Sequence, residues 1–131
     1  MELRSFVICE YASIRPDGIF NLIGGGIRCV NTTQLPFQFS ASILLIFDCS
    51  LDEGVFDFNI QLRDSDGKKL FNITQPLRVS TRTKAHTAVF RLEHLKFERA
   101  GEYSFEVFVG NKSLGSHPLS VAHKPSQSAS G

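Results

Sequence analysis

The chain has 131 residues, of which 42% are hydrophobic and 21% are charged, as in an ordinary soluble globular domain. Lysine and arginine number 14 against 13 acidic residues, a balance that argues against a dedicated nucleic-acid binder. This length can bury a core without disulfides or a structural metal. We therefore expect a single domain over residues 1–123, which the strand pattern indicates is a β-sandwich, and a mobile polar tail over 124–131, with neither a nucleic-acid partner nor a membrane.

The N-terminus and the cysteines indicate a cellular compartment. Arg4 and Glu10 interrupt the first apolar run, so it does not resemble a secretory signal, and we expect a cytoplasmic protein. The three cysteines, Cys9, Cys29 and Cys49, are odd in number and form no Cys-x-x-Cys pair. In a reducing compartment we expect reduced and mostly buried thiols, the alternative being one cross-strand disulfide with a leftover thiol.

The N-terminal part of the chain reads as a hairpin followed by an interrupted strand. A strand over 3–12 precedes Arg15-Pro16-Asp17-Gly18, a turn in which proline presets φ and Asp-Gly accepts the positive φ that follows. The chain then returns through apolar residues within 19–23. Gly24-Gly25-Gly26 interrupts this strand, which resumes over 27–32.

The middle of the chain predicts one central strand and one half-buried strand. Residues 37–47 contain a continuous apolar run, which predicts a central strand covered on both faces. In 55–63, apolar and polar residues alternate, which is typical of a half-buried strand. The apolar set should face the core, namely Phe56, Phe58, Ile60 and Leu62. The polar set should face solvent, namely Asp57, Asn59 and Gln61. A strand over 69–73 follows, and part of 75–84 is expected to be an exposed loop.

The most specific pattern of the chain lies between Phe90 and Phe105. A strand over 85–92 leads to a corner, Gly101 allows the turn, and Tyr103 opens the next strand. This spacing resembles the corner between the E and F strands of immunoglobulin-like sandwiches, where a tyrosine hydroxyl bonds back to the backbone. The resemblance to the E, F and G strands covers residues 90–121.

This immunoglobulin-like resemblance departs from the family pattern at two positions. Arg99 stands where the corner motif usually has Asp, and Phe105 stands where antibody domains place their second core cysteine. The chain also contains no Trp. These departures rule out an antibody-type domain and leave a generic sandwich.

About nine short strands joined by tight turns predict an all-β fold. We expect an antiparallel two-sheet sandwich, immunoglobulin-like or of a related Greek-key type. A barrel is the alternative, but it would show more even strand lengths.

The whole chain is similar to a family of short uncharacterised bacterial proteins. The similarity rests on the Cys9-Glu10 strand, the Asp17-Gly18 turn, Ile23-Gly24 and the closing Gly-x-Tyr-x-Phe pattern. It implies a bacterial, stand-alone cytoplasmic β-sandwich with no assigned activity.

No motif in the chain predicts a catalytic residue, a metal or a cofactor. Gly24-Gly25-Gly26 lacks the spacing and the following helix of a phosphate-binding loop, so we interpret it as a bulge or kink of an edge strand. The acidic residues near Asp48 and near Asp64 flank a strand of about 30 Å and cannot share a calcium ion. The four histidines show no zinc-binding spacing. An enzyme would need a cluster assembled only in space.

The candidate ligand-binding residues are Arg78, Arg82 and Lys84, the one local basic cluster. Solvated loop charge is the simpler interpretation of this cluster. A rigid sandwich without reactive groups favours a non-enzymatic binding or assembly module. It would act through contacts with an unknown protein partner or self-associate through a sheet edge. The alternative is a small-ligand or anion binder that uses loops at one end of the sandwich.

Overall fold

The computed structural model describes residues 1–16, 19–49, 53–80 and 84–124, and within them the chain forms nine β-strands. The strands are β1 (Glu2–Ile14), β2 (Phe20–Gly25), β3 (Cys29–Thr32), β4 (Phe37–Asp48), β5 (Gly54–Arg63), β6 (Lys69–Val79), β7 (Ala85–Phe97), β8 (Gly101–Val109) and β9 (Lys112–His123). The all-β prediction is confirmed. Arg82 and most of the predicted tail lie outside the described residues.

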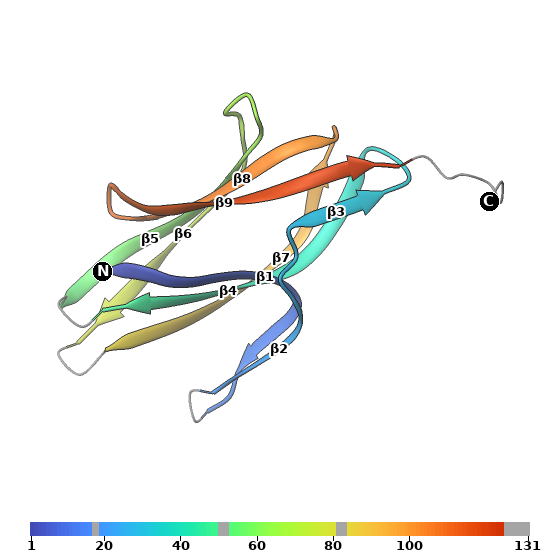
Figure 1. Cartoon of the computed structure of the whole chain (residues 1–131). Helices are drawn as coiled ribbons and strands as arrows, with labels where there is room; N and C mark the ends of the chain where they lie inside the picture. The colour runs from blue at the N-terminus through green and yellow to red at the C-terminus, as the bar shows by residue number, and fades with distance from the viewer. Residues whose placement is uncertain (17–18, 50–52, 81–83, 125–131) are drawn as a thin grey trace.

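Two sheets form the fold, as Figure 1 shows. The first sheet has the strand order β2-β1-β4-β7, and the second has the order β3-β9-β8-β5-β6. All neighbouring strands pair antiparallel except β3 and β9, which are parallel. The predicted two-sheet architecture is thus confirmed, and the parallel pair is a difference from a fully antiparallel sandwich.

The glycine run explains how the chain leaves the first sheet for the second. Gly24 and Gly26 have φ values of 63° and 82°, in the left-handed region that glycine adopts without strain. Beyond them, the N–H of Ile27 donates to the carbonyl oxygen of Ile8 in the first sheet. The carbonyl oxygen of Arg28 then accepts from Ser120 in the second sheet. The run is therefore a kink of an edge strand, as predicted, and it delivers β3 parallel to β9.

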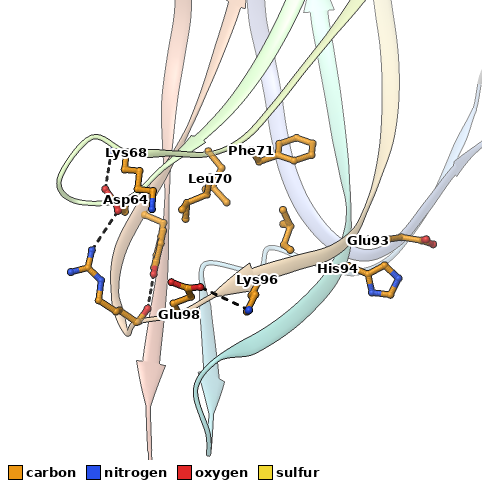
Figure 2. Close-up of a pocket in the computed structure, with 12 residues that line it drawn as sticks. Asp64, Lys68, Leu70, Phe71, Glu93, His94, Lys96 and Glu98 are labelled. Atoms are coloured by element: carbon orange, nitrogen blue, oxygen red, sulfur yellow. Dashed lines mark hydrogen bonds and ion pairs between the residues drawn. The ribbon is translucent and has the colours of Figure 1, made fainter.

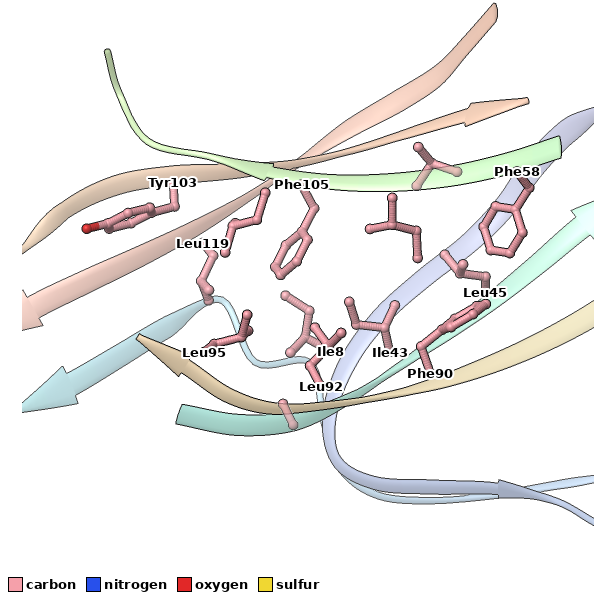
Figure 3. Packing of buried hydrophobic residues seen from close by; sticks show 14 of the residues in the cluster. Ile8, Ile43, Leu45, Phe58, Phe90, Leu92, Leu95, Tyr103, Phe105 and Leu119 are labelled. Carbon is pink, nitrogen blue, oxygen red and sulfur yellow. The ribbon is translucent and has the colours of Figure 1, made fainter. Parts of the chain in front are cut away.

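Side chains from both sheets form one hydrophobic core, shown in Figure 3. Phe58 of the second sheet meets Phe47 and Phe90 of the first sheet edge-on, with ring centroids 5.3 Å and 5.2 Å apart. Edge-to-face aromatic pairs add to the free energy that burial alone contributes. Together these rings hold the two layers against each other.

Strand β4 is central, and both of its faces are covered, as its apolar run predicts. Ile43 is fully buried in the core, and Leu44, on the opposite face, is only 2% exposed. Val7 and Val89 of the neighbouring strands are in register with Leu44. Side chains of the neighbouring strands therefore flank Leu44 on the outer face. The second sheet covers Ile43 on the inner face.

Strand β5 has the predicted register. Phe58, Ile60 and Leu62 are buried, and Phe56 is half-buried. On the other face Asp57 is exposed, while the remaining polar residues, Asn59 and Gln61, are half-buried. They are less exposed than predicted because β5 lies between β6 and β8 rather than at an edge.

Strand β6 is longer than predicted. Residues 75–79, part of the segment expected to be an exposed loop, pair with β5. Leu77 and Val79 are buried at alternate positions, whereas Pro76 and Arg78 are exposed. Proline lacks a backbone N–H, but an edge strand tolerates it. Leu77 and Val79 therefore form a period-two apolar pattern among the polar residues of this segment.

No disulfide joins the three cysteines, all of which lie in the described part of the chain. Cys9 and Cys49 are fully buried, but Cys29 is exposed. Cys29 is the first residue of the short edge strand β3. Because Val30 faces the core and successive side chains alternate, Cys29 faces outward.

Candidate functional site

The exposed apolar surface of the described residues is concentrated on the hairpin formed by β1 and β2. Seven large hydrophobic side chains of these residues are exposed, and five belong to this hairpin: Tyr11, Ile14, Ile19, Phe20 and Ile23. The other two, Val55 and Leu70, lie on β5 and β6. We call the five hairpin residues the apolar arm.

The arm projects because β1 changes its neighbour halfway along its length. Residues 2–9 of β1 pair with β4, whereas residues 9–14 pair with β2. Cys9 is the one β1 residue in both sets of described pairs. Beyond it, β1 and β2 continue as a two-stranded ribbon that diverges from β4 and from the second sheet, as Figure 1 shows. Neither sheet therefore covers the end of the ribbon.

Both faces of this ribbon carry apolar side chains. Tyr11 lies directly opposite Ile23, and Ile14 lies directly opposite Phe20. Residues directly opposite each other share a face, and successive residues alternate, so the two pairs lie on opposite faces. Their exposed fractions range from 38% for Phe20 to 59% for Ile23. The arm thus presents apolar surface on both sides.

Two residues of the sequence-predicted basic cluster lie in the described part of the chain. Arg78 is exposed on β6, and Lys84 is exposed just before β7. Neither Arg78 nor Lys84 lines any of three cavities of about 410–460 Å³ formed by described residues.

The largest of these cavities, about 460 Å³, lies between the β5–β6 turn and the end of β7 (Figure 2). Two ion pairs join charged side chains of its lining. Arg99 contacts Asp64 at 3.5 Å, and Lys96 contacts Glu98 at 3.9 Å. Asp64 also accepts hydrogen bonds from backbone N–H groups of its own turn. Charges of both signs thus offset each other and do not converge on one kind of ligand.

A second cavity of about 430 Å³ lies between β1 and β9 and is mostly apolar. The His117 ring stacks on Phe6, with centroids 4.1 Å apart and planes 4° apart. Burial lowers the pKa of His117, which favours a neutral imidazole. Its buried Nε2 has no hydrogen-bond partner within the described chain. The described lining of this cavity contains no carboxylate, hydroxyl or thiol.

The described residues form no candidate metal site. They include no group of three or more His, Cys, Asp or Glu residues placed to hold a metal ion. The same residues form no helix long and apolar enough to cross a membrane.

Comparison with known proteins shows the family. The model of a family of unknown function, DUF6941, matches residues 4–122. The chain belongs to this family. The predicted similarity to an uncharacterised family is therefore confirmed, whereas the immunoglobulin-like resemblance of residues 90–121 stays a prediction. No curated protein matches the chain.

Two solved structures resemble this member of DUF6941 at low sequence identity. One is the alkylpurine DNA glycosylase AlkC of Pseudomonas fluorescens bound to DNA with an abasic site analogue, at 11% identity and a TM-score of 0.48. The other is a β-glucosidase of Listeria innocua in complex with isofagomine, at 12% identity and a TM-score of 0.48. The matches cover 89% and 93% of this chain but only 30% and 17% of those chains.

Sequence reasoning recognised the β1–β2 hairpin of this DUF6941 member but not the exposure of its side chains. The apolar pattern within 11–23 reads like the pattern of a core strand. The available signal was the absence of charge, because no charged residue occurs between Asp17 and Arg28. That signal does not reveal that the ribbon extends beyond the core.

Proposed function

We propose that this protein is a non-enzymatic binding or assembly module that acts through protein–protein contacts made by its apolar arm. The observation that carries this proposal is the apolar surface on both faces of a ribbon that no other strand of the described residues covers. Burying apolar surface contributes roughly 25 cal/mol per Å². Large exposed apolar patches on proteins commonly mark sites of interaction with a partner.

The limited stability of a two-stranded ribbon supports the same proposal. An isolated hairpin is marginally stable in water and needs a third strand or a packed face to be well ordered. The end of the arm has neither among the described residues. A protein partner would supply the missing packing, and the apolar area buried against it would stabilise the complex.

Photo-crosslinking in the native host tests this proposal. A photoreactive phenylalanine analogue at Phe20 is expected to give a protein adduct of defined mass. The same analogue at Val55, which is 64% exposed but lies outside the arm, serves as the matched control. The yield of this adduct should fall when Ile23→Ser is introduced into the same chain. Equal background adducts from positions 20 and 55 would refute the proposal.

A small-ligand binder is the second candidate, and one observation favours it. The cavity between β1 and β9 holds the unpaired Nε2 of His117, with Arg28 among its lining residues. An apolar ligand with an anionic group would match this lining. Titration with medium-chain fatty acids, followed by NMR shifts of His117, tests this candidate, and shifts no larger than those of exposed His123 would exclude it.

A further inference from the structure

The outer face of the second sheet, which points away from the core, carries a polar cavity that is separate from the apolar arm. This cavity has a volume of about 410 Å³ and is lined by residues of β5, β6, β8 and the turn after β8. Strand β5 contributes a row of four polar side chains at alternate positions, which therefore share one face: Asp57, Asn59, Gln61 and Arg63.

The strand register places an aromatic ring beside this polar row. Asn59 lies directly opposite Phe108 of β8 on one side and opposite Thr74 of β6 on the other. Residues directly opposite each other share a face of the sheet. Phe108 also lines the cavity and is half-buried, whereas the preceding residue, Val107, is fully buried in the core. The cavity thus combines polar side chains with one phenylalanine ring.

Hydrogen bonds from Arg63 fix the direction of the Gln61 amide. The Nε and Nη2 atoms of Arg63 both donate to Oε1 of Gln61, at 3.2 Å and 2.7 Å. Because a guanidinium only donates, this arrangement leaves both N–H donors of Gln61 Nε2 for another partner. No atom of the described residues accepts from them. Gln61 therefore presents two donors that are oriented before a ligand arrives.

The same row also contains acceptors without donors. The Asp57 carboxylate is exposed and forms no hydrogen bond or ion pair with the described residues. The Nδ2 atom of Asn59 donates to the carbonyl oxygen of Ile73 at 3.0 Å and to Thr74 Oγ1 at 2.8 Å. Its buried Oδ1 has no partner within the described chain. The hydrogen-bonding capacity of this row is therefore not met by the described residues.

We propose that this face of the second sheet binds a neutral oligosaccharide. A sugar hydroxyl both donates and accepts, so neighbouring hydroxyls match the acceptors of Asp57 and the donors of Gln61. These two residues lie about 13 Å apart along the strand, a span longer than one sugar ring. The apolar C–H face of a sugar ring would pack on Phe108. This inference is independent of the proposed function, because the apolar arm takes no part in it.

Other classes of ligand fit this face less well. A peptide cannot add here as a strand, because β5 is already paired with β6 on one side and with β8 on the other. The one guanidinium of the cavity lining, Arg63, is offset by the Asp57 carboxylate, and Glu106 lies opposite Gln61. This balance of charge disfavours the phosphates of a nucleic acid and the carboxylates of an acidic sugar.

A microarray of neutral and acidic oligosaccharides, probed with the full chain, tests this inference. We expect binding to a neutral oligosaccharide, whose Kd is then measured by isothermal titration. Gln61→Glu removes both amide donors but keeps the side-chain size and the acceptor for Arg63, and it should weaken binding at least about tenfold. Gln38→Glu, the same change at an exposed position of β4, should leave the Kd unchanged. No binding to a neutral sugar, a preference for acidic sugars, or an unchanged Kd in Gln61→Glu would overturn the inference.

NMR titration of the wild type with the same sugar locates the site without relying on a variant. The side-chain amide of Gln61 and the ring of Phe108 should shift more than the side-chain amide of Gln38. Phe108→Leu removes the ring face and should weaken binding about tenfold. Phe71→Leu, at a half-buried ring outside this cavity, is the matched control, and melting temperatures verify that both variants fold. Largest shifts elsewhere, such as at Tyr11 of the apolar arm, would also overturn the inference.

Discussion

The Tyr103 hydroxyl donates a hydrogen bond to the backbone carbonyl oxygen of Arg99, at 2.5 Å, across the corner between β7 and β8. The ring packs edge-on against Phe97 with centroids 4.8 Å apart, and the residue is only 6% exposed. Burial raises the pKa of the phenol, which keeps it a neutral donor. The predicted structural role of Tyr103 at this corner is confirmed.

Tyr103→Phe is expected to lower the free energy of unfolding by about 1–2 kcal/mol, because the carbonyl of Arg99 loses its side-chain donor. Urea denaturation measures this loss. Tyr11→Phe removes a hydroxyl from a ring that is 52% exposed and should change stability by less than about 0.5 kcal/mol. A Tyr103→Phe variant that is as stable as the wild type would show that the bond contributes nothing.

His94→Gly is expected to stabilise the protein by about 0.5–1 kcal/mol. His94 has a φ of 59°, in the left-handed region that costs a non-glycine residue roughly 1–2 kcal/mol. Part of this gain is offset by the greater backbone entropy of glycine in the unfolded chain. Lys96→Gly, in ordinary strand geometry on β7, should lose about 0.5–1 kcal/mol. Thermal unfolding compares the two, and equal losses would argue against strain at His94.

Native thiol labelling should distinguish the three cysteines. Cys29 is exposed and is expected to react quickly, whereas Cys9 and Cys49 are fully buried. Burial also raises the pKa of the Cys9 thiol, which lowers the fraction of reactive thiolate. Ellman's reagent should detect one fast thiol in the folded protein, none in Cys29→Ser, and three in the unreduced, denatured wild type. Finding only one after denaturation would reveal a disulfide.

Stability should fall as the pH drops below about 6.5, the ordinary histidine pKa. Burial lowers the pKa of His86 and of His117 in the folded state, so the unfolded chain binds these protons more readily. Protonation of the unfolded chain therefore favours unfolding at acidic pH. Denaturation at pH 7.5 and pH 5.5 should show a smaller loss of stability for His117→Phe than for the wild type. A loss unchanged in the His86→Phe/His117→Phe double variant would contradict this cause.

Local patterns in the sequence determined several features of this protein without help from the structure. The alternation from Phe56 to Leu62 predicts which face of β5 is buried, because side chains alternate sides along any strand. The spacing from Gly101 to Tyr103 predicts the corner and its hydrogen bond, which depend on residues close in the chain. The glycine run at 24–26 likewise predicts a kink, since its cause is the backbone freedom of glycine itself.

Tertiary structure alone decided which apolar faces are covered. Ile43 and Ile23 are equally apolar, yet the first is fully buried and the second is 59% exposed. The difference arises because β1 leaves β4 after Cys9 and continues with β2 alone. Burial depends on which strands lie alongside, and that choice is made by residues distant in the chain. The arm, and with it the candidate site, therefore exists only in the folded arrangement of the sheets.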